Sequence, residues 1–156
     1  MWVDPGLVSG YAFYDYISRN FGCGEESLTG LGERLRALAT SLPPWDLAVG
    51  CEDYLNAGRG RGTPRYSYAV MGMVEWLAHD YAFTQLPAVP SGMRKLGSVN
   101  KLKKLGWYRM TKGGHSADAS RHLLSDMLRN HRQRALPEEV HRILFADDGP
   151  ADTLPT

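Results

Sequence analysis

The sequence contains only two cysteines, Cys23 and Cys51, among its 156 residues. Neither belongs to a CxxC pair or to a Cys/His spacing typical of zinc ligands, so the sequence predicts neither a disulfide framework nor a zinc knuckle and favours a reducing compartment. No run approaches the roughly 18 apolar residues of a membrane-spanning helix, and the first residues do not resemble a secretory signal. We therefore expect a cytoplasmic protein that does not cross a membrane.

Acidic residues are missing altogether from residues 81–117, a stretch that holds seven lysines and arginines. The formal net charge of +1 hides this segregation, because residues 137–156 contain five acids and one base and so leave +5 on residues 1–136. A run of charge is often only a solvated face, but an acid-free basic stretch favours phosphate contacts and salt-dependent DNA binding. The predicted DNA-binding residues, including those of a second basic segment, are Arg59, Arg61, Arg65, Arg94, Lys95, Lys101, Lys103, Lys104, Arg109 and Lys112.

Hydrophobic patterning predicts a single α/β domain over residues 1–145, followed by an acidic tail at 146–156 that we expect to be disordered. Three short strands in an antiparallel meander are followed by alternating helices and strands, which predicts a five-stranded mixed sheet flanked by helices. In such sheets, ligands collect at the carboxyl ends of central strands. The expected strands are 1–4, 10–17, 20–23, 47–51 and 82–90, and the expected helices are 31–42, 66–80, 99–105 and 116–134.

Three acids and a histidine occupy the ends of these elements. Asp4 ends the first strand, Glu52 ends the buried fourth strand, and His115 and Asp118 lie on one face at the start of the last helix. If the two strands are neighbours, these groups converge and repel one another unless divalent cations neutralise them. Oxygen-rich ligands suit Mg²⁺ or Mn²⁺, and two ions about 3.5 to 4 Å apart would activate water against a phosphodiester.

Each of these residues also has a simpler interpretation. The Asp-Pro-Gly sequence at Asp4 is common in turns, and Glu52 could be a solvated strand end. His115 follows two glycines and could cap the helix, while Asp118 in its first turn could merely favour the helix dipole. Each signal is weak alone, but their order along the chain favours metal-assisted nuclease chemistry.

Three motifs resemble those of the RuvC-type Holliday junction resolvases. The sequence DPGLVSGY at residues 4–11 is similar to the family's opening strand and turn. Glu52 at the end of an apolar strand resembles its second acidic motif, and HSADA at residues 115–119 resembles its final one. The resemblance covers about residues 1–130, points especially to the small resolvases encoded by bacterial viruses, and implies an RNase H-like fold. In that setting the cytoplasm is that of a bacterium or of an infected host cell.

The resemblance implies that Asp4, Glu52 and Asp118 are metal ligands and that His115 takes the place of a fourth. Two Mg²⁺ ions per subunit are expected, with Mn²⁺ as a substitute. Asp53 is an extra acid that could compete with Glu52 for the ligand role. Because neighbouring residues of a strand point to opposite faces, only one of the two should reach the metals.

The resemblance also implies basic and aromatic helpers. Arg94 or Lys95, and then Lys101, fall where basic residues of the family assist the reaction. Tyr54 lies near the position of an aromatic residue that stacks on bases at the junction.

Two residues of the last helix could support the ligands. His122 follows Asp118 by one helical turn, so that it could orient a ligand, contact phosphate or simply pack in the core. Arg121 is ambiguous in the same way.

Together these features predict a metal-dependent endonuclease that resolves four-way DNA junctions by paired symmetric nicks. The resemblance implies that each nick has 5′-phosphate and 3′-hydroxyl ends. Two symmetric cuts require a two-fold homodimer, for which the helix at 66–80 is the candidate interface. The alternatives are a nuclease acting on flaps, forks or packaging intermediates, and a catalytically inactive DNA-binding module. No nucleotide cofactor is expected, because 156 residues are too few for the two lobes of an actin-like ATPase or sugar kinase.

Overall fold

The computed structural model describes residues 1–53, 65–87, 89–90, 96–130 and 136–145. Its centre is a mixed sheet of strand order β3-β2-β1-β4-β5, with β6 also paired to β4. The first three strands form an antiparallel meander, and β4 lies parallel to β1. This arrangement confirms the predicted mixed α/β sheet. The strands are β1 (Trp2–Asp4), β2 (Val8–Asp15), β3 (Asn20–Ser27), β4 (Ala48–Asp53), β5 (Thr84–Gln85) and β6 (Val89–Pro90).

The fifth strand differs from the prediction in one respect. Residues 82–90 contribute two short pieces, β5 and β6, and each pairs in parallel with a different part of β4. Pro87 lies between the two pieces, and a proline has no backbone N–H to donate to a sheet ladder. The strand is therefore interrupted, although its place in the sheet is the predicted one.

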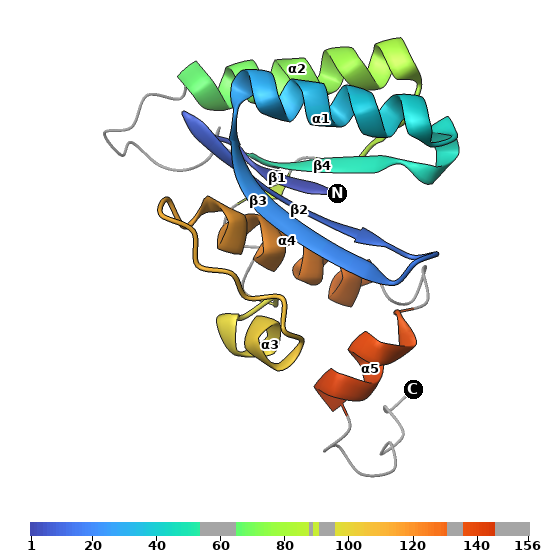
Figure 1. The fold of residues 1–156 in the computed structure, drawn as a ribbon, viewed down its shortest axis with the longest axis vertical. Coiled ribbons are helices and arrows are strands. Elements are labelled where there is room, and N and C mark those ends of the chain that lie inside the picture. Colours follow the sequence, from blue (N-terminus) through green and yellow to red (C-terminus); the bar gives the residue numbers. More distant parts are fainter. Residues whose placement is uncertain (54–64, 88, 91–95, 131–135, 146–156) are drawn as a thin grey trace.

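Helices cover both faces of the sheet (Figure 1). One face is covered by α1 and α2, which pack against each other, and the other by α4, which contacts β1, β2 and β3. The smaller helices α3 and α5 lie on the same side as α4. A short 3-10 turn, Pro44–Asp46, separates α1 from β4. The helices are α1 (Leu28–Ser41), α2 (Arg65–Tyr81), α3 (Val99–Lys104), α4 (His115–Asn130) and α5 (Glu138–Phe145).

Alternation along β1 and β4 divides the core into two apolar layers. Val3, Val49 and Cys51 belong to the layer under α1 and α2, whereas Trp2 belongs to the layer under α4. Gly50 gives room to the Trp2 indole, since a Cβ there would lie 2.7 Å from its ring. Asp4, which follows Val3 on β1, and Glu52, which follows Cys51 on β4, therefore face α4.

Gly10 lets the start of α4 approach the sheet closely. A Cβ at this position would lie 2.0 Å from the carbonyl oxygen of His115, a contact that no side chain could make without displacing backbone. The opening turn of α4 consequently sits directly on β2, beside the end of β1.

The sequence patterns did not predict α5, whose Val140 is buried in the layer under α4. Trp107, which lies within the basic stretch, is buried and stacks on Phe21 at 4.6 Å between ring centroids, so it belongs to the core.

None of the described helices is long and apolar enough to span a membrane. The tail at 146–156 falls outside the described residues.

Candidate active site

Asp4 and Glu52 lie next to each other at the carboxyl ends of neighbouring parallel strands. The register pairs Val3 with Cys51, so the two acids follow one residue further along β1 and β4. Each of these two residues is only 1% exposed. Burial of two adjacent acids is costly unless they are hydrogen-bonded or paired with positive charge, and the structure shows a histidine on each of them.

His115, the first residue of α4, contacts Asp4. Its Nδ1 lies 2.7 Å from Oδ2 of the aspartate. The His115 side chain retains about a third of its surface exposed, whereas the Asp4 side chain is buried. This pair joins the first strand to the last long helix and leaves the outer side of the imidazole open to a ligand.

His122 contacts Glu52 in a fully buried pair. Its Nε2 lies 3.0 Å from Oε2 of the glutamate, and the imidazole stacks on Trp2 at 5.7 Å between centroids. His122 follows His115 by two helical turns, so one face of α4 reaches both acids. The sequence left open whether His122 orients a ligand, contacts phosphate or packs in the core; the structure places it, buried, against Glu52.

Asp118 lies one turn after His115 and is paired with Arg121. The distance from Nη1 of Arg121 to Oδ1 of Asp118 is 3.2 Å, and Nε of the same guanidinium donates to the Gly97 carbonyl at 3.3 Å. About a third of the Asp118 side chain is exposed. Arg121 thus ties the predicted third acid to the segment that precedes α3.

The four predicted ligands form pairs in this structure and not one compact cluster. Within the described ranges, no three His, Cys, Asp or Glu side chains are gathered closely enough to hold a metal ion. Each acid instead contacts a donor on α4, as a buried or half-buried carboxylate requires: His115 for Asp4, His122 for Glu52 and Arg121 for Asp118. His122 and Arg121, which were predicted only as supporting residues, are two of those donors.

The donor chemistry of the site nonetheless fits a divalent cation. Two buried carboxylates on adjacent strand ends supply oxygen ligands, which Mg²⁺ and Mn²⁺ prefer, and Asp118 and His115 start the helix that meets them. Burial, and after it the negative charge of Asp4, raises the pKa of the Cys51 thiol to about 12.

Glu25 on β3 is a residue that the sequence analysis missed. Its carboxylate accepts hydrogen bonds from the Thr111 hydroxyl and from the backbone N–H groups of Gly113, His115 and Ser116. Burial alone would raise the pKa of Glu25, but these hydrogen bonds together lower it below its usual value. No local sequence signal marks this residue, because its partners lie about ninety positions further along the chain.

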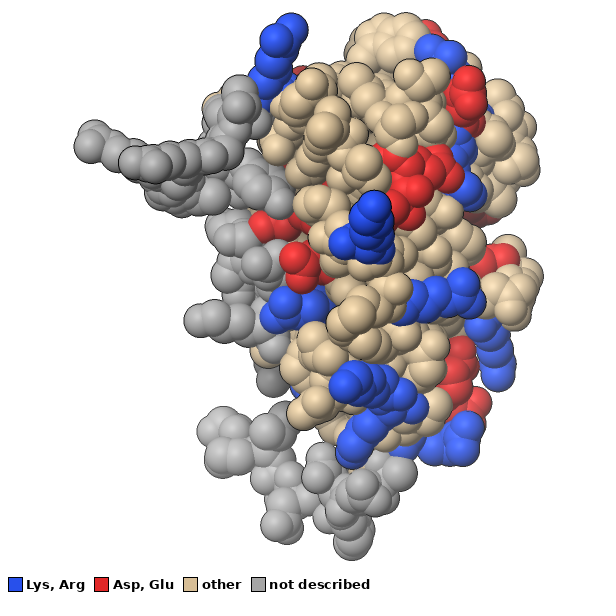
Figure 2. All heavy atoms as spheres, turned by 60° about the vertical axis from the view of Figure 1, so that its left-hand side comes forward, with Lys and Arg blue, Asp and Glu red and all other residues tan. Residues whose placement is uncertain are grey.

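Basic side chains lie on the face next to this site. Figure 2 brings the left-hand side of Figure 1 forward and shows lysines and arginines spread over that face, with acidic side chains between them. Lys101 is half-buried, and the other described members of the predicted set are exposed. The structure describes Arg65 in α2, Lys101, Lys103 and Lys104 in α3, and Arg109 and Lys112 before α4. The positions of Tyr54, Arg59, Arg61, Arg94 and Lys95, and the side chain of Asp53, lie outside what it describes.

The sheet order and the helices on both faces give an RNase H-like fold, as the resemblance implied. No protein-family model matches the sequence, and no curated protein matches it with significance. Among solved structures, this chain is similar to T. thermophilus RuvC in complex with Holliday junction substrate, with a TM-score of 0.55 at 15% identity. The alignment covers 86% of this chain and 96% of that one, so the shared fold extends over nearly the whole RuvC chain.

Proposed function

We propose that the protein is a divalent-metal-dependent endonuclease that cuts four-way DNA junctions. The observation that carries this proposal is the burial of Asp4 and Glu52 side by side at the carboxyl edge of the sheet, with His115 from α4 on Asp4. The similar RuvC structure was solved with a Holliday junction substrate, which supports branched DNA as the substrate class.

Asp4, Glu52 and Asp118 would hold two Mg²⁺ ions per subunit, with His115 in the fourth place and Mn²⁺ as a substitute. When bound, such ions lower the pKa of an attacking water and stabilise negative charge on the phosphate. The protein's own part is to fix the acceptor oxygens in place. His115 orients Asp4 through Nδ1, and the imidazole of His122 orients Glu52.

Basic residues beside the site would bind the DNA backbone and steady the phosphate. Lys101 in α3 is proposed to stabilise the charge that develops on the phosphate during cleavage. Arg94 and Lys95 stay predictions for the same role. Attack by water on phosphorus in line with the P–O3′ bond would break that bond, with the 3′ oxygen leaving as a hydroxyl, and would give a nick with 5′-phosphate and 3′-hydroxyl ends.

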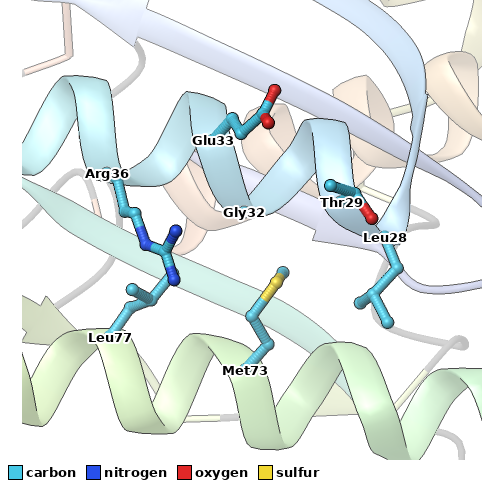
Figure 3. A pocket seen from close by; sticks show the side chains of 7 residues that line it. All are labelled: Leu28, Thr29, Gly32, Glu33, Arg36, Met73 and Leu77. Atoms are coloured by element: carbon cyan, nitrogen blue, oxygen red, sulfur yellow. The ribbon is translucent and has the colours of Figure 1, made fainter.

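Resolution of a junction needs two symmetric cuts and hence two copies of the site, so we propose a two-fold homodimer. The α2 helix exposes Tyr68 and Trp76, about half of each side chain being accessible. Between α1 and α2 lies a groove lined by the apolar Leu28, Met73 and Leu77 and by the polar Thr29, Glu33 and Arg36 (Figure 3). Trp76→Glu should then give a monomer in sedimentation experiments that nicks junctions on one strand only. A wild-type monomer persisting on junction DNA would contradict the dimer.

The test of the activity is a cleavage assay on a labelled four-way junction, a flap and a linear duplex in Mg²⁺. We expect paired nicks in the junction, lost in Asp118→Asn while junction binding persists. Asp126→Asn is the matched control, because Asp126 lies on the same helix two turns further on, where its carboxylate accepts a hydrogen bond from Asn130. It should cleave as the wild type does.

Two other outcomes would favour the alternatives. If the flap or the duplex is cut as well as the junction, the protein is still a nuclease, but its substrate is a flap, fork or packaging intermediate and not specifically the four-way junction. Binding of the junction without cleavage of any substrate would indicate an inactive DNA-binding module.

A further inference from the structure

The Glu25 carboxylate accepts hydrogen bonds from backbone N–H groups at the start of α4. The first N–H groups of a helix have no partner within the helix, and a carboxylate is well suited to accept from them. Two of these groups, those of His115 at 2.8 Å and Ser116 at 3.5 Å, point at one oxygen of Glu25, and the Gly113 N–H at 3.3 Å points at the other. The Thr111 hydroxyl donates as well.

The segment held in this way carries the proposed ligands. The N–H that Glu25 accepts most closely is that of His115, whose imidazole contacts Asp4. Ser116 is buried and its hydroxyl lies 2.8 Å from the Thr111 hydroxyl. On β2, the backbone of Gly10 packs directly against the same turn. The first turn of α4 is therefore fixed between β3 and β2, and the position of His115 over Asp4 follows from it.

The next residue of the strand provides an internal comparison. Glu26 is paired with Arg34 of α1, with Nε at 2.8 Å from the carboxylate. Because neighbouring strand residues point to opposite faces, Glu25 serves α4 and Glu26 serves α1. The two acids have the same side-chain length and lie on the same strand, but Glu25 is the one that holds the helix carrying the site.

We propose that Glu25 is a positioning residue. It holds the first turn of α4 against the sheet, so that His115 and Asp118 lie where they complete the proposed metal site. This inference rests on the proposed function. It assigns to β3, a strand that contributes no predicted ligand, the task of holding the ligands contributed by α4.

The substitution Glu25→Gln tests the role with minimal change of shape. A carboxylate has two acceptor oxygens, whereas the glutamine amide has one acceptor and one NH₂ donor. At least one of the four donors would therefore face another donor, and the turn would shift. Glu26→Gln removes the equivalent charge on the opposite face and serves as the matched control.

The measurement is Mn²⁺ affinity of the full-length protein, by calorimetry or by the loss of the free-ion EPR signal, with junction cleavage measured in parallel. We expect Glu25→Gln to weaken Mn²⁺ binding on the order of 10-fold or more, the usual effect of losing a partner that orients a ligand. Glu26→Gln should bind as the wild type does. Thr111→Val, which removes one donor and leaves the acid, should shift the affinity in the same direction by less.

Equal Mn²⁺ affinity in the Glu25 and Glu26 variants, with the wild type binding normally, would overturn the positioning role and leave the proposed function intact. Absence of Mn²⁺ binding in the wild type would overturn both. If Glu25→Gln does not fold, as judged by circular dichroism, the Thr111→Val affinity decides: a value equal to that of the wild type would overturn the role.

Discussion

The His122 imidazole, which has no exposed surface, lies between the Glu52 carboxylate and the ring of Trp2. Its Nδ1 has no hydrogen-bond partner among the described residues, so the contact with Glu52 through Nε2 is the polar interaction that the structure gives to this ring. At the scale of single residues, the site thus contains a buried pair whose contribution to stability can be separated from its contribution to activity.

We predict that His122→Leu destabilises the fold by about 3 kcal/mol, because it removes a hydrogen-bonding partner of the buried Glu52 carboxylate. The double variant Glu52→Leu/His122→Leu should regain much of this loss, since apolar replacement of a buried pair is often neutral or favourable. It should nonetheless be inactive, because a proposed ligand is gone. Urea unfolding measures the first effect and junction cleavage the second. A double variant less stable than His122→Leu would contradict the prediction.

At the scale of elements, α4 depends on the close approach that Gly10 permits on β2. Glycine in a strand normally costs stability, and its presence here is explained by the backbone of the helix above it.

Gly10→Ala should therefore destabilise the protein by about 2 kcal/mol, the usual cost of overpacking, and lower cleavage because His115 is displaced. Gly72→Ala is the matched control. Gly72 lies in α2, where an added methyl group would meet nothing within 4 Å, so alanine there should stabilise by about 0.5 to 1 kcal/mol through helix propensity. Thermal unfolding of the two variants gives the comparison, and the same sign for both would refute it.

A second element, α5, is tied to the sheet through a hydrogen bond from the Tyr14 hydroxyl to Glu139. The Tyr14 hydrogen bond, and after it other nearby groups, lowers the pKa of Glu139 below its usual value of 4.5 despite partial burial. A group whose pKa is lower in the folded state stabilises the fold above its unfolded pKa, and that contribution is lost as the pH falls through the folded pKa.

We predict that docking of α5 weakens as the pH falls below about 4.5, the usual pKa of a glutamate. Tyr14→Phe should remove this part of the acid dependence, because the residue that depresses the pKa is absent. Hydrogen exchange of the Val140 amide, followed from neutral to acidic pH and corrected for the intrinsic rate, provides the readout. Identical pH dependence in the wild type and in Tyr14→Phe would show that the contact is not responsible.

At the scale of the whole molecule, lysines and arginines of α3 and of the segment before α4 lie on the side of the sheet that carries the proposed site. They come from a stretch of the chain without acids, so their field is not cancelled by sequence neighbours. Such charges act on a polyanion together, through the counterions that binding releases.

The salt dependence of junction binding is expected to report their number. Lys103→Ala and Lys112→Ala should each reduce the slope of log affinity against log salt by about 1 and weaken binding to all DNA sequences alike. Arg34→Ala, in α1 on the opposite side of the sheet, where the guanidinium is paired with Glu26, should leave the slope unchanged. Fluorescence anisotropy over a salt series gives these slopes, and an unchanged slope in both lysine variants would remove them from the DNA interface.

Local patterns sufficed to predict most of the fold and to single out Asp4, Glu52, His115 and Asp118 as candidate site residues. A few neighbouring residues are enough to recognise the leucine spacing of α1, the apolar run before Glu52 and the turn after Asp4. The order of these elements along the chain then predicts an antiparallel meander followed by parallel strands. Short-range patterns cannot predict the role of Glu25 or the pairing of His122 with Glu52, because 70 to 90 residues separate the partners in the sequence. The sequence did not predict α5 because its eight residues are fewer than the roughly 11 to 18 over which a helical period is recognised.

The two histidine pairs close loops of very different length in the chain, since His115 and Asp4 are 111 residues apart and His122 and Glu52 are 70 apart. Synthesis from the N-terminus releases Asp4 and Glu52 from the ribosome before α4. A nascent chain that has not yet reached α4 therefore holds only two of the four proposed metal ligands. The proposed metal site can be completed only after His115 and Asp118 have been added.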